Sequence, residues 1–291
     1  MAEITFLLPA RRLDALQRTL SMLSLLRGGG FRAVVVDDTG SGAVDAIVPD
    51  FEEQFPLSVV TVTPDGDPLW KYCLAAAPEA EWVCFLAPGV DLTEKSVVRM
   101  RKCIDGHPSY DAFRWNLAAP ARKWRLRTRP DRIFTRVFED GDDAPLGTFV
   151  FRAETLRTVF ATDSEAAVSD MAVILAGAKK AGVRTARRVR VNYTAPAPST
   201  DPAEMEKEVR SRLAFFRWSE RFFEEEYPLG VGDRLALFAG ELAKLYPSYT
   251  LEELKDDLAT FACVNGPIRR MKASSALKSA LKARQESLKQ A

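Results

Sequence analysis

Two buried strands joined by one helix, with adjacent carboxylates at the end of the second strand, constrain this chain more than any other feature. Residues 4–8 form a short apolar run, and residues 31–36 form a second run that leads directly into Asp37 and Asp38. Between them, leucines recur at helical spacing over residues 13–26. A strand, a helix and a second strand in this order are parallel with a right-handed crossover, so both strands end at the same sheet edge. Ligands of such sheets bind at that edge, which predicts a binding site at the acidic pair.

The same alternation continues along the next part of the chain. Four strand and helix units in about a hundred residues predict a doubly wound α/β sheet with helices on both faces. Beyond residue 195 the sequence is helical in character, so we expect an α/β domain over residues 1–195 and an all-helical C-terminal region over residues 196–291. The predicted strands after the first two are 57–62, 82–86, 112–117, 149–151 and 189–193, and the later helices of the α/β domain are 42–55, 70–77, 94–104, 153–160 and 169–181.

Charge and cysteine content exclude several classes of function. The 41 Lys and Arg residues nearly cancel the 40 Asp and Glu residues, so no overall positive field attracts nucleic acid. The four cysteines form no C-x-x-C pair, which favours reduced thiols over disulfides or a zinc site. No apolar stretch approaches the roughly 20 residues that cross a bilayer, and no secretion signal is expected at the N-terminus. We therefore expect a cytoplasmic protein that binds no nucleic acid.

The segments at the ends of the first two strands carry a family resemblance. Residues 8–12 are Leu-Pro-Ala-Arg-Arg, and residues 36–41 are Val-Asp-Asp-Thr-Gly-Ser. With the motifs described below, they resemble the family 2 glycosyltransferases of the GT-A fold. The resemblance implies that Pro9, Ala10 and Arg12 lie at a sugar nucleotide, with Arg12 in place of the family's usual Asn.

The acidic pair has a role in this family that chemistry supports independently. The second Asp of the motif meets the base of the sugar nucleotide, which implies nucleotide binding by Asp37 and Asp38 and base recognition by Asp38. An ionised carboxylate only accepts hydrogen bonds, and the imide N–H of uracil or thymine is a matching donor. In the alternative interpretation, both carboxylates cap the turn that follows the strand.

Residues 66–72, Gly-Asp-Pro-Leu-Trp-Lys-Tyr, occupy the place where the family has a Gly-led segment with an Arg-Asn pair. The resemblance implies that Asp67 and Lys71 lie at the nucleotide, with Lys71 aligned to the Arg and able to meet a phosphate. Tyr72 replaces the Asn. The alternative for Lys71 is a solvated position on a short helix.

The end of the fourth predicted strand departs from the family. The family usually has Asp-x-Asp there, which holds Mg²⁺ or Mn²⁺ against the diphosphate. Residues 87–89 are instead Ala-Pro-Gly, whose side chains cannot ligate a metal. Asp91 is a displaced metal ligand in one interpretation and the N-terminal cap of the next helix in the other. We expect either a Mg²⁺ or Mn²⁺ site that uses Asp91 or a metal-independent protein.

A general base for an inverting transfer is implied further along the chain. In the family this carboxylate begins the helix after the acceptor loop, and Ser169 and Asp170 stand at that point, downstream of an acceptor-side strand at 146–152. The resemblance makes Asp170 the base. The alternative is that both residues only begin the helix, where Ser and Asp are common.

The tail at residues 269–289 is basic, with apolar residues at nearly helical spacing. It predicts either a peripheral contact with an anionic membrane surface or a partner protein, or a solvated helix.

The sequence leaves two functions as alternatives. Both depend on the family resemblance, which covers about residues 3–195. The first is transfer of a sugar from a nucleotide-diphosphate sugar, with UDP-sugars favoured, to a glycan, lipid or protein acceptor. The second is a catalytically inactive GT-A-like domain that binds a nucleotide sugar, a glycan or a partner protein. A Rossmann-type dehydrogenase is disfavoured because no Gly-x-Gly-x-x-Gly follows the first strand.

Overall fold

The structure is a computed structural model, and it describes residues 1–10, 12–26, 30–40, 42–63, 68–86, 89–118, 127–129, 133, 145–167, 169–194, 215 and 218. The chain divides into two compact units, Met1–Pro196 and Ala197–Ala291. In the second unit the described residues are Phe215 and Trp218, which are helical and buried, with ring centroids 6.0 Å apart.

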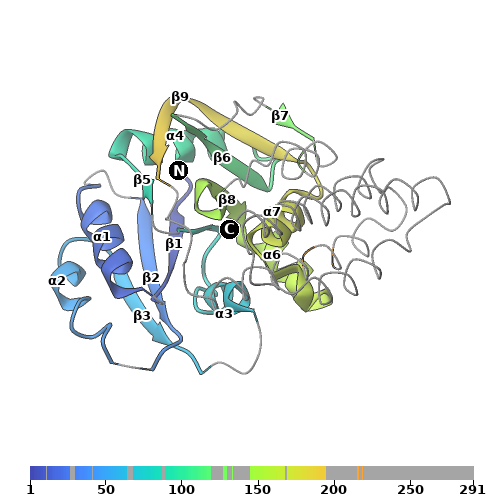
Figure 1. The fold of residues 1–291 in the computed structure, drawn as a ribbon. Coiled ribbons are helices and arrows are strands. Elements are labelled where there is room, and N and C mark those ends of the chain that lie inside the picture. The colour runs from blue at the N-terminus through green and yellow to red at the C-terminus, as the bar shows by residue number, and fades with distance from the viewer. Residues whose placement is uncertain are drawn as a thin grey trace, which may run out of the picture. The chain divides into compact units, whose positions relative to one another are not determined.

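A mixed sheet forms the centre of the first unit (Figure 1). Its strands are β1 (Ile4–Pro9), β2 (Phe31–Asp37), β3 (Leu57–Thr61), β4 (Trp82–Phe85), β5 (Val90–Asp91), β6 (Ala112–Leu117), β7 (Arg127–Thr128), β8 (Phe149–Arg152) and β9 (Val183–Tyr193). Their order is β3-β2-β1-β4-β8-β6-β9-β5, and β7 pairs with β9. β8 is antiparallel to both of its neighbours, β4 and β6, whereas β1 to β4 are parallel to one another and β6 is parallel to β9. The strands β6 and β9 therefore run in the same direction as β1 to β4.

Helices cover both faces of this sheet (Figure 1). They are α1 (Leu13–Ser24), α2 (Pro49–Glu52), α3 (Leu69–Ala75), α4 (Glu94–Asp105), α6 (Ala153–Thr162) and α7 (Asp170–Ala178), with 3₁₀ turns η1 (Leu146–Thr148) and η2 (Ser164–Ala167). The buried residues of α1 and α4 share one core cluster with Phe6 and Trp115. Side chains alternate along a strand, so Phe85 and Phe151 point to the other face, where α3, α6 and α7 contact one another.

Gly177 allows α7 to lie close to this second face. A Cβ atom at Gly177 would overlap the ring of Phe151, so a larger residue would move either the helix or the ring. The Phe151 ring in turn lies 6.5 Å from that of Phe85, centroid to centroid. The position of α7 is thereby fixed against β8 and β4.

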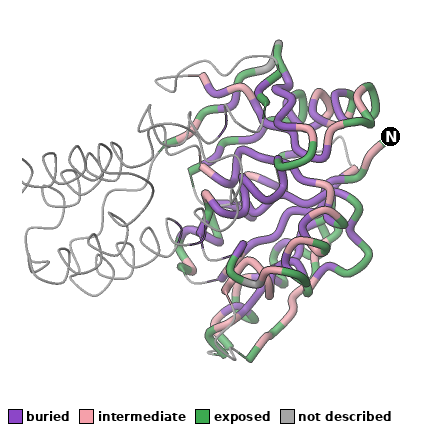
Figure 2. The backbone as a smooth tube through the Cα atoms, turned by 90° about the vertical axis from the view of Figure 1, so that its right-hand side faces the viewer, coloured by how far each residue is buried: buried purple, intermediate pink, exposed green. Residues whose placement is uncertain are grey.

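The burial pattern follows this layered arrangement. Figure 2 shows the central strands as a nearly continuous buried layer with exposed turns around it. β4 is buried along its whole length, as expected for a strand with helices on both faces. None of the helices in the described part of the chain is long and apolar enough to span a membrane.

The expected fold class is confirmed, and two predicted elements are wrong in extent. The helix predicted over 42–55 is reduced to α2, because Pro49 begins a helix readily but the preceding residues form only turns. The strand predicted over 189–193 begins already at Val183. Basic residues such as Arg184 and Arg187 interrupt its apolar pattern, and pairing with β6 and β7 nevertheless makes the segment a strand.

Candidate functional site

The carboxyl ends of β1, β2 and β3 lie side by side at one edge of the sheet. Pro9, the last residue of β1, is in register with Val36, and the Ala10 N–H donates to the Val36 carbonyl at 3.0 Å. On the other side of β2, the Val62 N–H donates to the Asp37 carbonyl at 2.9 Å. The predicted clustering of these strand ends is therefore present.

Asp37 organises the turn that follows β2. Its side chain is buried, and Oδ1 accepts hydrogen bonds from the Thr39 N–H at 2.9 Å and the Thr39 hydroxyl at 2.6 Å. The Thr39 hydroxyl, with smaller contributions from the Thr39 and Gly40 N–H groups, holds the pKa of the Asp37 carboxyl below its ordinary value despite burial. Of the two roles considered for Asp37, the structure gives its side chain the turn-capping one.

Replacement of Thr39 with valine is expected to lower the free energy of unfolding by about 1 to 2 kcal/mol at neutral pH, since a hydrogen bond to a charged group is lost. The pKa of Asp37 is lower in the folded than in the unfolded chain, so its stabilisation is present above about pH 4 and is lost as the pH falls through the folded value. The difference in the free energy of unfolding between Thr39→Val and the wild type should therefore become smaller at acidic pH. Urea unfolding between pH 3 and 7 measures it, and Thr39→Ser, which keeps a hydroxyl, should behave as wild type.

Asp38 is half-buried at the sheet edge, with its Oδ1 atom shielded from solvent. The other residues predicted at the nucleotide differ in exposure. Pro9 is half-buried, the Ala10 methyl is buried, and Arg12 is exposed just before α1, where its guanidinium lies 3.5 Å from Asp14. Asp38 therefore lies at the sheet edge where the sequence predicted it, and Ala10, whose methyl group is buried, can present only its backbone to a ligand.

The first residue of α7 lies at this same edge. Because β8 is antiparallel, it ends at the opposite edge, and α6 starts there. α7 then leads to the amino end of β9, which is also at the opposite edge, so its own beginning, Asp170, is at the edge of Asp38. The fold thus brings the predicted base and the predicted base-binding carboxylate to one side of the sheet.

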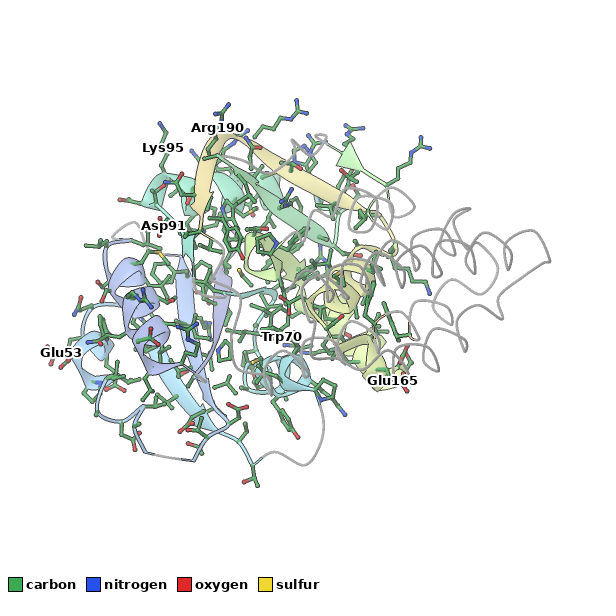
Figure 3. The ribbon with its side chains drawn as sticks, in the orientation of Figure 1. Glu53, Trp70, Asp91, Lys95, Glu165 and Arg190 are labelled. Carbon is green, nitrogen blue, oxygen red and sulfur yellow. The ribbon has the colours of Figure 1, made fainter. Side chains whose placement is uncertain are left out.

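A hydrogen bond that the sequence analysis missed links Asp170 to α3. The indole Nε1–H of Trp70 donates to Asp170 Oδ1 at 3.0 Å, across 100 residues of sequence. The Trp70 ring lies edge-on to that of Phe85, with centroids 5.2 Å apart. Trp70, labelled in Figure 3, is the second residue of α3, and the next residues of that helix, Lys71 and Tyr72, are half-buried.

Ser169 and Asp170 have separate roles at the start of α7. Ser169 is the N-cap, since its hydroxyl accepts a hydrogen bond from the Ala172 N–H at 3.2 Å. Asp170 is exposed in the first turn. An acidic residue there is favoured by the helix dipole, but the capping requirement is met by Ser169.

The end of β4 excludes a metal-binding side chain at position 89. Gly89 has φ +96°, and a Cβ atom there would overlap the Thr194 carbonyl oxygen. The two backbones are held together by a hydrogen bond from the Thr194 N–H to the Gly89 carbonyl at 2.8 Å. The last position of the family's Asp-x-Asp is therefore closed to aspartate by local geometry as well as by sequence.

Asp91 lies in β5 opposite Asn192, and its side chain is exposed (Figure 3). The prediction that it caps the next helix is wrong. α4 is capped by Thr93, whose hydroxyl accepts from the Ser96 N–H at 3.2 Å while the Thr93 N–H donates to the Ser96 hydroxyl at 2.9 Å. Within the described ranges, no group of three His, Cys, Asp or Glu side chains is placed to hold a metal ion.

A pocket of about 570 Å³ lies at the other edge of the sheet, away from Asp38 and Asp170. On one side of it Arg152 donates to Asp111 at 2.9 Å and stacks over the Trp82 ring at 4.5 Å. These contacts hold the last residue of β8 in place and pair the positive charge of Arg152 with the carboxylate of Asp111. Several predicted features lie outside the described residues: Asp67, the Ala-Pro pair at 87–88, the basic tail at 269–289 and, apart from Phe215 and Trp218, the helical C-terminal region at 196–291.

Comparison with known proteins gives matches only among solved structures. No protein-family model and no curated protein matches the sequence. The structure of residues 1–349 of S. aureus TarS is similar with a TM-score of 0.53 at 15% identity, covering 99% of this chain and 91% of that one. The same protein in complex with UDP-GlcNAc gives a TM-score of 0.53 at 15% identity, covering 99% and 92%. In complex with UDP it gives 0.51 at 14% identity, covering 99% and 91%.

This likeness extends over nearly the whole of both chains and is one of fold. The mixed sheet, with helices on both faces and the antiparallel strand β8 between the parallel strands β4 and β6, is the GT-A fold of glycosyltransferases.

Proposed function

We propose that this protein transfers a sugar from a nucleotide-diphosphate sugar to a hydroxyl group of a glycan, lipid or protein, as family 2 glycosyltransferases do. The observation that carries the proposal is the placement of Asp38 and Asp170 at one edge of a GT-A sheet. In this proposal Asp38 accepts the imide N–H of the donor's base, and Arg12 and Lys71 lie near its phosphates. Single carboxylates at such positions match the need for one base-recognising acceptor and one general base.

The proposed reaction is a single inverting displacement. Asp170 takes the proton of the acceptor hydroxyl as that oxygen forms a bond to the anomeric carbon. The bond from the anomeric carbon to the diphosphate oxygen breaks at the same time, and the nucleoside diphosphate leaves with the electron pair. The configuration at the anomeric carbon is thereby inverted.

The residues at the end of β4 do not fit the divalent cation that the fold family implies. Position 89 has no room for a carboxylate, and Asp91 stands two residues further on, in β5. The proposed reaction therefore uses no metal ion. Assays with Mg²⁺, Mn²⁺ or EDTA test this: activity that persists in EDTA supports metal-independent transfer, and activity lost in EDTA would require a cation bound by other residues.

The nucleotide-binding part of the proposal is tested with Asp38→Ala. Isothermal titration with UDP, GDP and dTDP should identify one preferred nucleotide in the wild type, and UDP is favoured. The variant should bind it about 10- to 100-fold more weakly, since a hydrogen bond to a charged group contributes about 1.5–3 kcal/mol.

Asp50→Ala is the matched control, because Asp50 is an exposed carboxylate in α2 of the same unit. It should leave the affinity unchanged. Equal affinities for wild type and Asp38→Ala would contradict the assignment of Asp38 to the base.

An inactive nucleotide-sugar-binding protein is the second candidate, and the closed position at Gly89 favours it. Donor hydrolysis and transfer distinguish the two. UDP-GlcNAc is the first donor to test, because TarS, which has the same fold, is known in complex with it. Binding without turnover in the presence of Mg²⁺, Mn²⁺ or EDTA would reject transfer in favour of the binding protein.

A further inference from the structure

We infer that Trp70 is a positioning residue for the general base, an inference that rests on the proposed function. The geometry that points to it is the hydrogen bond from the Trp70 indole N–H to Asp170 Oδ1, 3.0 Å long. An indole N–H can only donate, so its natural partner is the ionised carboxylate that a base requires before it takes a proton. The bond holds the carboxylate plane in one orientation about the side-chain torsion that an exposed aspartate otherwise explores.

Trp70 is itself fixed by a row of aromatic rings. Its ring packs edge-on against Phe85 at 5.2 Å, and Phe85 lies 6.5 Å from Phe151, both of them fully buried. Phe151 is the ring against which Gly177 of α7 is closely packed. The donor on α3 and the helix that carries Asp170 are therefore positioned by the same two phenylalanines.

This arrangement makes the orientation of the carboxylate independent of the acceptor. A misplaced catalytic group lowers the reaction rate by up to about 100-fold for a displacement of about 1 Å. A base that is held in place before the acceptor arrives avoids this loss of rate. Trp70 acts through Asp170 in this account and does not itself meet the reacting atoms.

The test is Trp70→Phe, which keeps a ring against Phe85 and removes the N–H. We expect kcat for transfer to fall about 10- to 100-fold, with KM for the donor unchanged, because donor binding does not involve this bond. In an Asp170→Asn background the same substitution should have no further effect, since the two residues act as one unit.

A spectroscopic measurement supplies a second readout that requires no substrate. The chain has five tryptophans, and the indole ¹H–¹⁵N signal lost in Trp70→Phe identifies Trp70. That signal should shift in Asp170→Ala, an exposed substitution that removes the acceptor, and should stay in place in Glu165→Gln, a control at an exposed carboxylate of η2.

The outcomes separate this inference from the proposed function. If Asp170→Asn abolishes transfer while Trp70→Phe retains wild-type kcat, the positioning role is overturned and the proposed function stands. An indole signal that does not respond to Asp170→Ala overturns it as well. If the wild type transfers no sugar from any donor, both proposals fail.

Discussion

Replacement of Asp170 with asparagine is expected to lower kcat for sugar transfer by about 10²- to 10⁴-fold, the usual contribution of a positioned general base. Asparagine has nearly the same shape and can still accept the Trp70 indole N–H, so the loss isolates the proton transfer from the local structure. Nucleotide affinity should stay at the wild-type value, because the base acts on the acceptor. The measurement is a steady-state assay of nucleoside diphosphate release with a saturating donor.

Two controls distinguish a base from a helix-starting residue. Ser169→Ala removes the N-cap of α7 and should lower stability by about 1 kcal/mol, while the folded protein keeps most of its activity. Glu165→Gln removes another exposed carboxylate of the same region and should leave the rate unchanged. A rate for Asp170→Asn within a few-fold of wild type would show that another group accepts the proton.

Replacement of Gly89 with alanine is expected to lower the free energy of unfolding by about 2 to 5 kcal/mol. The left-handed backbone costs about 1–2 kcal/mol for a residue with a side chain, and overlap with the Thr194 carbonyl adds about 1–3 kcal/mol for forced repacking. Thermal unfolding of the full chain, followed by circular dichroism, measures the change as a lower midpoint.

Gly40→Ala is the matched control for this prediction. Gly40 also has positive φ, at +60°, but a Cβ atom there would have no neighbour within 4 Å. It should therefore cost only the backbone contribution, about 1–2 kcal/mol. Equal losses for the two alanine variants would show that the backbone of residue 89 can move away from Thr194, and that the position could accept a ligand side chain after all.

The parts of the fold that follow from local pattern were predictable. The strands β1, β2, β4 and β6 are buried apolar runs bounded by polar or turn residues, and each was placed to within about two residues. β9 was predicted at less than half its length. Its arginines resemble a solvated segment, and only pairing with β6 and β7 makes it a long strand.

The site was predictable at strand ends and unpredictable across long sequence separations. The topology that brings Asp38 and Asp170 to one edge follows from the order of strands and helices. Which of the two adjacent carboxylates caps the turn depends on side-chain geometry within that turn, where Asp37 accepts hydrogen bonds from Thr39. The sequence alone does not distinguish Asp37 from Asp38 in this respect. The contact between Trp70 and Asp170 depends on how two helices pack over one face of the sheet, and no residue pattern in either segment predicts it.

The antiparallel strand β8 also determines the order in which the sheet can be completed during synthesis. β4 has β1 on one side and β8 on the other, and β6 reaches the first half of the sheet only through β8. Until residues 149–152 have left the ribosome, β4 is an open edge, and open edges invite pairing with other chains. A nascent chain that stalls after β6 therefore exposes a four-stranded half sheet, and expression as a fragment ending before β8 should yield aggregated protein.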